Sequence, residues 1–294
     1  MNTQTLTTGG TIRSAANRGL ANWRIGIIWI FATLIPAAIV ALPVGQLIAD
    51  ALDHSMFAAE WAKGWDLTAV VELVSNSTDF ASVLTGAAIV SVIVTLLFWP
   101  FLSAMIISTA NDEDPAGFVA LFQAGARSYG RMFRMLLWSV VPFGIAGGIG
   151  GVAVHLTHKM GEKAILESTA HHEHTAAVIF MLALLLLAHI TVEAGRAQFA
   201  LDAGRRSAVK AWWRGVKLIK ARPLAAFGSY LALTIGGFAL MALLGWIRIN
   251  VPHASLFGIL LALCLTQLIV MAAVWMRASR LLALIRIGAI HGRG

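Results

Sequence analysis

Charged residues, cysteine and tyrosine are all scarce in this sequence of 294 residues. Charged residues make up 12% of the chain and hydrophobic residues 59%, whereas a soluble domain carries about 25% charged residues. This shortage argues against a water-soluble enzyme and against a disordered chain. The single cysteine, Cys264, excludes an internal disulfide and a metal site made of several cysteines. Because Cys264 stands in an apolar run, we expect it to be a small buried hydrophobe.

Motifs of known enzymes are missing as well. The sequence contains no Gly-x-Ser-x-Gly elbow, no His-Glu-x-x-His pair and no Walker motif. We therefore expect a protein that is not an enzyme, has no catalytic residues and needs no cofactor.

Long apolar runs dominate the sequence instead and give a mean hydropathy of +0.79. A helix needs about 20 mostly apolar residues to cross ~30 Å of hydrocarbon. Six segments meet this requirement: Ile25–Leu42, Ala81–Ser108, Met135–Leu156, Thr175–Ala194, Pro223–Trp246 and Ser255–Met276. The predicted fold class is all-α, a polytopic membrane protein with six transmembrane helices. Pro36 and Pro142 should kink the first and third spans.

Lysine and arginine are distributed unevenly between the loops. The N-terminal tail, the loops after the second and fourth spans and the C-terminal tail together hold 18 of the 22 basic residues. The positive-inside rule then places both termini in the cytoplasm, and we expect a bacterial inner membrane. The net charge of +8 is thus an orientation signal, and nucleic acid is not an expected partner.

Basic stretches that precede each pair of spans suggest a threefold repeat. The three stretches, 18–24, 124–130 and 214–220, align on a glycine at Gly19, Gly125 and Gly215. The outgoing spans end in Arg-Ala at 196–197 and at 277–278, with a weaker Ser-Ala match at 103–104. We therefore predict one membrane domain, 1–294, in which an in-plane helix and a helical hairpin repeat over 12–114, 115–204 and 205–294.

The clearest in-plane helix runs from Arg205 to Arg222, because basic and apolar residues both recur there every three or four positions. Val209, Val216 and Ile219 belong to its apolar stripe. Such a helix anchors the next hairpin, or docks an anionic lipid phosphate or an acidic protein partner. The residues expected at the level of the lipid headgroups are Arg206, Lys210, Trp212, Trp213, Arg214, Lys217 and Lys220.

The third span contains a glycine-rich run. Gly144 with Gly148, and Gly147 with Gly151, form small-xxx-small faces that favour close packing against another helix. A phosphate-binding loop is excluded because no Lys-Ser/Thr follows and no strand precedes the run.

Histidines gather around the loop between the third and fourth spans, at His155, His158, His171, His172 and His174. Together with Glu173 they have the chemistry to bind Zn, Cu or Ni, or to sense pH near neutrality. A solvated polar loop explains the same residues without a ligand, and a zinc signature with tight helix-face spacing is missing.

Three polar or ionisable residues fall inside spans, namely His189, Glu193 and Gln267. Because His189 and Glu193 are four residues apart, they share one helix face and have the spacing for a proton relay. Glu193 lies near the end of its span, so we expect it to pair with Arg196 and snorkel toward water. The first three spans carry no central charge, which argues against an ion-coupled transporter with a charged midplane site.

The layout resembles six-helix bacterial inner-membrane proteins that are similar to the membrane domain accompanying some glycerophosphodiester phosphodiesterases. The segment Trp212–Pro223, which runs into an apolar span, and the three hairpins carry this resemblance from about Arg18 to Arg286. The acidic metal ligands of the phosphodiesterase domain have no counterpart in the sequence, so the resemblance implies a membrane location and no activity.

Two functions remain as hypotheses. The first is a non-enzymatic inner-membrane protein that handles a lipid or another amphiphile, or that serves as the membrane subunit of a larger assembly. The second is a small transporter or channel whose His-rich periplasmic loop binds metal or senses pH.

Overall fold

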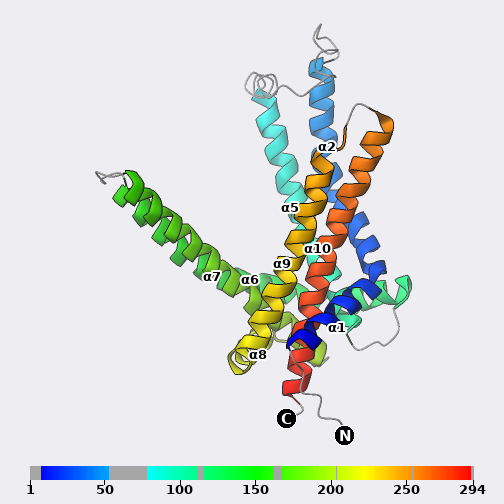
Figure 1. Ribbon diagram of the computed structural model, residues 1–294. Coiled ribbons are helices and arrows are strands. Elements are labelled where there is room, and N and C mark those ends of the chain that lie inside the picture. Colours follow the sequence, from blue (N-terminus) through cyan, green and yellow to red (C-terminus); the bar gives the residue numbers. More distant parts are fainter. Residues whose placement is uncertain are drawn as a thin grey trace. The chain divides into compact units, whose positions relative to one another are not determined.

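The computed structural model describes residues 8–52, 78–110, 116–161, 167–202, 204–252 and 255–292 (Figure 1). The described residues form eight helices and no strand, which confirms the all-α prediction. The helices are α1 (Thr8–Ala21), α2 (Trp23–Leu52), α5 (Thr78–Ser108), α6 (Phe118–Gly161), α7 (Glu167–Leu201), α8 (Ala208–Ala221), α9 (Pro223–Ile249) and α10 (Leu256–His291).

Six of these helices, α2, α5, α6, α7, α9 and α10, are long and apolar enough to cross a membrane, as predicted. Several extend well beyond the predicted spans: α6 begins at Phe118 and α10 continues to His291. The hydropathy window marks only the most apolar part, whereas a helix, once nucleated, propagates through adjoining polar turns. At 44 residues, α6 is about 66 Å long, roughly twice the ~30 Å hydrocarbon core.

The chain divides into two compact units that are described separately. The first unit contains α1, α6, α7 and α8, together with the end of α5 from Ser103, the start of α9 to Gly237 and the end of α10 from Trp275. The second unit contains α2 and the remaining parts of α5, α9 and α10.

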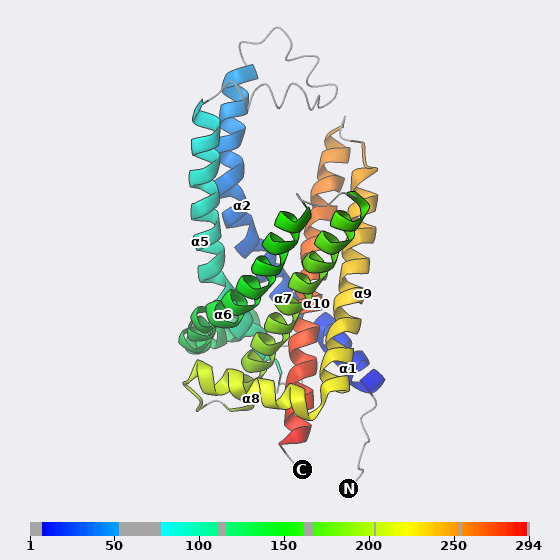
Figure 2. The same ribbon diagram turned by 90° about the vertical axis from the view of Figure 1, so that its left-hand side faces the viewer.

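In the second unit, α2 and α5 run side by side (Figures 1 and 2). Trp29 and Trp99 meet edge to face with their ring centroids 6.0 Å apart. The Ser91 hydroxyl donates a hydrogen bond to the carbonyl oxygen of Pro36 at 3.0 Å. These contacts link the two helices at the level of the proline predicted to bend the first span.

Also in the second unit, Arg248 of α9 donates a hydrogen bond to the Thr266 hydroxyl of α10 at 2.8 Å. Gln267 lies on the same part of α10, and its buried amide oxygen has no hydrogen-bond partner among the described residues. Cys264 is exposed, so the expectation that it is buried is wrong. A membrane span is apolar on every side, and an apolar neighbourhood in the sequence therefore does not show which side faces the protein.

In the first unit, the end of α10 is buried on all sides. The five consecutive residues Leu281–Ile285 are each at most 5% exposed. A helix that buries consecutive residues is surrounded by protein, whereas a helix at the surface buries only one stripe. The last part of α10 is thus the centre of this unit.

The helices α6 and α7 lie side by side in both views (Figures 1 and 2). Gly150 is the glycine that packs closely between them, because an added Cβ would lie 2.9 Å from the Cα atom of Met181. The predicted glycine faces are wrong. An added Cβ at Gly144, Gly147, Gly148 or Gly151 would meet nothing within 4 Å.

The three basic stretches that precede the predicted pairs of spans differ in structure. The first and third are the separate helices α1 and α8, which end just before Asn22 and Arg222. The backbone N–H of each of these two residues still donates to a carbonyl four residues earlier, Arg18 and Leu218 respectively. The second basic stretch is continuous with the following span and forms one helix with it, α6. The threefold repeat therefore stays a prediction.

Candidate functional site

The buried charged residues of the described chain all belong to two helices of the first unit. They are Glu193 and Arg196 on α7 and Arg277 and Arg280 on α10. Glu193 is 2% exposed and the three arginines are 6–8% exposed. Charged residues are rarely buried without partners, so this cluster is the candidate functional site.

Helical spacing explains why these residues converge. Glu193 and Arg196 are three apart on α7, and Arg277 and Arg280 are three apart on α10, so each pair lies on one helix face. Both helices continue past the arginines, α7 to Leu201 and α10 through the apolar stretch Leu281–Ile285. The arginines consequently lie inside helices rather than at their frayed ends.

Arg280 is the most extensively bonded member of the cluster. One terminal nitrogen lies 3.5 Å from Glu193 Oε1, and the other donates to the Thr234 hydroxyl at 3.2 Å. Its guanidinium carbon stands 4.9 Å from the centroid of the Tyr230 ring, in cation–π range. Arg280 thereby links α10 to α7 and α9.

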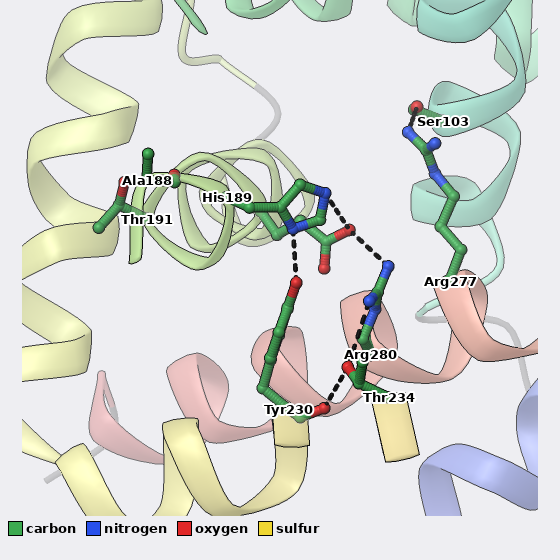
Figure 3. Close-up of polar contacts among 9 residues, drawn as sticks. Ser103, Ala188, His189, Thr191, Tyr230, Thr234, Arg277 and Arg280 are labelled. Atoms are coloured by element: carbon green, nitrogen blue, oxygen red, sulfur yellow. Dashed lines mark hydrogen bonds and ion pairs between the residues drawn. The ribbon is translucent and has the colours of Figure 1, made fainter. Parts of the chain in front are cut away.

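A second chain of polar contacts runs through His189. Its Nδ1 atom forms a hydrogen bond with the Tyr230 hydroxyl at 2.5 Å, and its Nε2 atom lies 3.9 Å from Glu193 Oε1. Figure 3 shows His189, Tyr230, Thr234 and Arg280 pointing toward one another from three helices. The sequence prediction that His189 and Glu193 share a face is confirmed by this contact.

Arg277 reaches the end of α5, where it donates a hydrogen bond to the Ser103 hydroxyl at 2.9 Å (Figure 3). Arg196 interacts electrostatically with Glu193, but no hydrogen bond joins it to another described residue. The expected snorkelling pair of Glu193 and Arg196 is wrong: both side chains are buried, and Glu193 is closest to the cationic Arg280. Because α7 continues to Leu201, Glu193 is too far inside the helix bundle to reach water.

The cluster carries an excess of positive charge. Arginine stays protonated in proteins, so three arginines and one glutamate give it a formal charge of +2. Two of its buried atoms also lack hydrogen-bond partners among the described residues, namely Glu193 Oε2 and Arg280 Nε. Buried charge and unpaired polar atoms each cost free energy, and an anion at this position would offset both costs.

Sequence reasoning found His189 and Glu193 but missed Arg277, Arg280 and Tyr230. In the sequence, Arg277 and Arg280 belong to the basic C-terminal segment that predicts the orientation in the membrane. The signal that identifies them as buried is the apolar run that follows, Leu281–Ile285. A C-terminal tail exposed to water would not be expected to contain such an apolar run.

The predicted in-plane helix corresponds to α8, which begins after its N-cap Ser207. Its buried face consists of small and aliphatic residues, including Ala211, Gly215 and Leu218. Trp212 points into the protein, since its indole nitrogen donates to the Thr191 hydroxyl at 3.1 Å. Its indole N–H thus has a partner on α7, and its place at the level of the lipid headgroups stays a prediction.

Val209 and Trp213 of α8 are 47% and 54% exposed, beside exposed basic residues. Those basic residues are Arg206, Lys210, Arg214, Lys217 and Lys220. The exposed surface of this segment is thus both apolar and cationic.

The histidine cluster is only partly described. The rings of His158 and His174 are 6.4 Å apart, centroid to centroid, while the side chain of His171 lies outside the described residues. Among the described residues, no group of three or more His, Cys, Asp or Glu side chains is arranged to hold a metal ion. Metal binding by His155, His158, His171, His172 and His174 stays a prediction.

No protein-family model, curated protein or solved structure matches this chain. The resemblance to the phosphodiesterase-associated membrane domain therefore stays a prediction, and the site is interpreted from its own geometry.

Proposed function

We propose that the protein is a non-enzymatic integral membrane protein that binds an anionic amphiphile at its buried arginines. The observation that supports this function is the formal charge of +2 buried in helices apolar enough for a membrane. A negatively charged headgroup would balance the arginines through charge-assisted hydrogen bonds. Its acyl chains would suit the apolar surface of the same helices.

The surface of α8 supports the same function. Its exposed lysines and arginines lie beside Val209 and Trp213, a composition typical of helices in the interfacial layer of a membrane. Each basic residue near an anionic membrane surface contributes about 1 kcal/mol of attraction. This helix would concentrate anionic lipids next to α7, which carries half of the buried cluster.

We also propose that the membrane is a bacterial inner membrane and that the arginine-rich helix ends face the cytoplasm. The uneven distribution of 18 of 22 basic residues supports this orientation. The buried cluster would then bind its ligand on the cytoplasmic side.

Lipid binding by the purified protein tests this function. In a neutral detergent, native mass spectrometry should show tighter binding of phosphatidylglycerol than of phosphatidylcholine with the same acyl chains. The Arg277→Gln variant should bind phosphatidylglycerol about tenfold more weakly, which corresponds to ~1.4 kcal/mol.

The matched control is Arg127→Gln, which removes one positive charge from an exposed position on α6, away from the cationic surface of α8. It should change the affinity by less than threefold, and thermal unfolding should show both variants to be folded. Equal affinity of the wild type for the two lipids would contradict the proposed function, as would full affinity in Arg277→Gln.

A further inference from the structure

We propose that the anionic group bound by the arginine cluster is a phosphomonoester, and that a phosphodiester fits it less well. This inference rests on the proposed function and adds the chemical class of the ligand. It follows from two independent features of the cluster, its charge and its unpaired hydrogen-bonding atoms.

The first feature is the charge. Glu193 cancels one of the three arginines and leaves a formal charge of +2. A phosphodiester or a carboxylate brings one negative charge and leaves the buried site cationic. A phosphomonoester carries about −1.5 to −2 charges at pH 7 and brings the site close to neutrality. Because the residues are at least nine-tenths buried, water screens the remaining charge poorly.

The second feature is the pair of unpartnered atoms. Arg280 Nε is a donor and Glu193 Oε2 is an acceptor, and both are buried without a hydrogen-bond partner among the described residues. A ligand that satisfies both must accept one hydrogen bond and donate another. A phosphomonoester that keeps its second proton does this, because its P–O⁻ oxygens accept and its P–OH group donates. In that form it carries one negative charge, so the monoanion meets the hydrogen-bonding requirement and the dianion meets the charge requirement.

Other common anions lack one of these properties. Phosphodiesters and ionised carboxylates are acceptors only, so they leave Glu193 Oε2 unpaired and facing a second negative group. Sulfate has the charge of −2 but no proton to donate at neutral pH. A phosphomonoester meets one requirement in each of its forms, the charge of the site as the dianion and the hydrogen bond to Glu193 as the monoanion, whereas a phosphodiester group meets neither.

The positions of the arginines are suitable for such a ligand. Arg280 is held by Thr234 and by the Tyr230 ring, and Arg277 is held by Ser103. Since Arg196 has no hydrogen bond to another described residue, its planar fork is available for two bonds to one phosphate. A phosphate group has enough oxygens to take bonds from more than one arginine.

The test compares a lipid phosphomonoester with a lipid phosphodiester that carries a glycerol headgroup. Affinities are measured by native mass spectrometry for phosphatidic acid and phosphatidylglycerol with identical acyl chains, using the full chain in neutral detergent. The wild type should prefer phosphatidic acid by at least about tenfold. The Arg196→Gln variant, which lowers the formal charge from +2 to +1, should lose most of this preference.

Two matched variants separate charge from structure. Arg196→Lys keeps the charge but lacks the planar fork, so it should keep more of the preference for phosphatidic acid than Arg196→Gln keeps. Arg127→Gln removes one charge from an exposed position on α6, so it should leave the preference unchanged.

Competition with inorganic phosphate and with sulfate identifies the source of the group. Displacement of phosphatidic acid by millimolar phosphate but not by sulfate would support free phosphate as a ligand. A preference that persists without displacement would support a lipid phosphomonoester.

The outcomes distinguish this inference from the function on which it rests. If the wild type binds phosphatidic acid and phosphatidylglycerol equally, and both more tightly than phosphatidylcholine, the inference is overturned and the proposed function stands. If none of the three lipids is preferred, both are overturned. An Arg127→Gln variant that loses the preference as fully as Arg196→Gln would also overturn the inference.

Discussion

Glu193 is the one acid buried among the described residues, and its Oε1 atom contacts cations or polar groups on two helices. Arg280 approaches it from α10 and His189 from its own helix. The carboxylate therefore lowers the repulsion between three arginines that would otherwise face one another in a medium of low dielectric constant. This position makes Glu193 the most sensitive residue of the cluster.

Replacing Glu193 by alanine should lower the free energy of unfolding by about 3–5 kcal/mol, the usual cost of removing one partner from a buried ion pair. Unfolding in detergent, followed by circular dichroism, measures this change. Asp202→Asn is the control, because Asp202 is 48% exposed and pairs with Arg205 at 2.7 Å. It should cost less than about 1 kcal/mol. Similar losses in the two variants would show that Glu193 does not hold the cluster together.

Part of this site could be predicted from the sequence. His189 and Glu193 lie on one helix, so their contact follows from a spacing of four residues. The partners Tyr230 and Arg280 lie 41 and 87 residues away along the chain, and no local period relates them. The arginines also fit the positive-inside rule, which explains basic residues near the end of a span without requiring that they be buried.

Among whole elements, α8 packs against α7 through a small residue, Gly215. An added Cβ at Gly215 would lie 2.5 Å from the backbone nitrogen of Gly195 and 2.6 Å from the carbonyl carbon of Ala194. Both are backbone atoms of α7, so no side-chain rotation relieves the clash. The two helices cross here at their closest approach, next to Arg196.

Gly215→Ala should therefore lower the free energy of unfolding by about 1–3 kcal/mol, the usual cost of overpacking. The matched control is Gly148→Ala on α6, where an added Cβ meets nothing within 4 Å. That change should stabilise the protein by up to about 1 kcal/mol, because alanine is the better helix former. The opposite signs are measurable by thermal unfolding in detergent, and a gain in stability for Gly215→Ala would refute the packing at this crossing.

Comparing α8 with α6 shows which features of a helix can be predicted from the sequence. Helical periodicity identified α8, including its basic face, because that pattern is local. It also identified two glycine faces on α6 that have no neighbour within 4 Å. A pattern of small residues shows where a helix can approach, but the partner is determined by the tertiary fold. Gly150, which packs against Met181, cannot be told apart from the other glycines of that run.

At the scale of the whole molecule, the six long apolar helices correspond to the six spans predicted from hydropathy. Hydropathy predicted all six helices because the cost of unpaired backbone groups in hydrocarbon leaves few alternatives to long apolar helices. The division of α5, α9 and α10 between two compact units could not be predicted, since nothing in the sequence of a continuous helix marks that boundary.

The predicted orientation can be tested across one helix, α9. Its 27 residues extend about 40 Å, enough to separate Ala221 from Asn250 on opposite sides of a membrane. Both positions are exposed, and a Cys264→Ser background leaves each introduced cysteine as the only thiol. In spheroplasts, a membrane-impermeant maleimide should label Asn250→Cys at once and Ala221→Cys only after lysis, because the proposed orientation places the basic end of α9 in the cytoplasm. The reverse pattern would place the arginine cluster on the outer side, and labelling of both positions before lysis would show that α9 does not span the membrane.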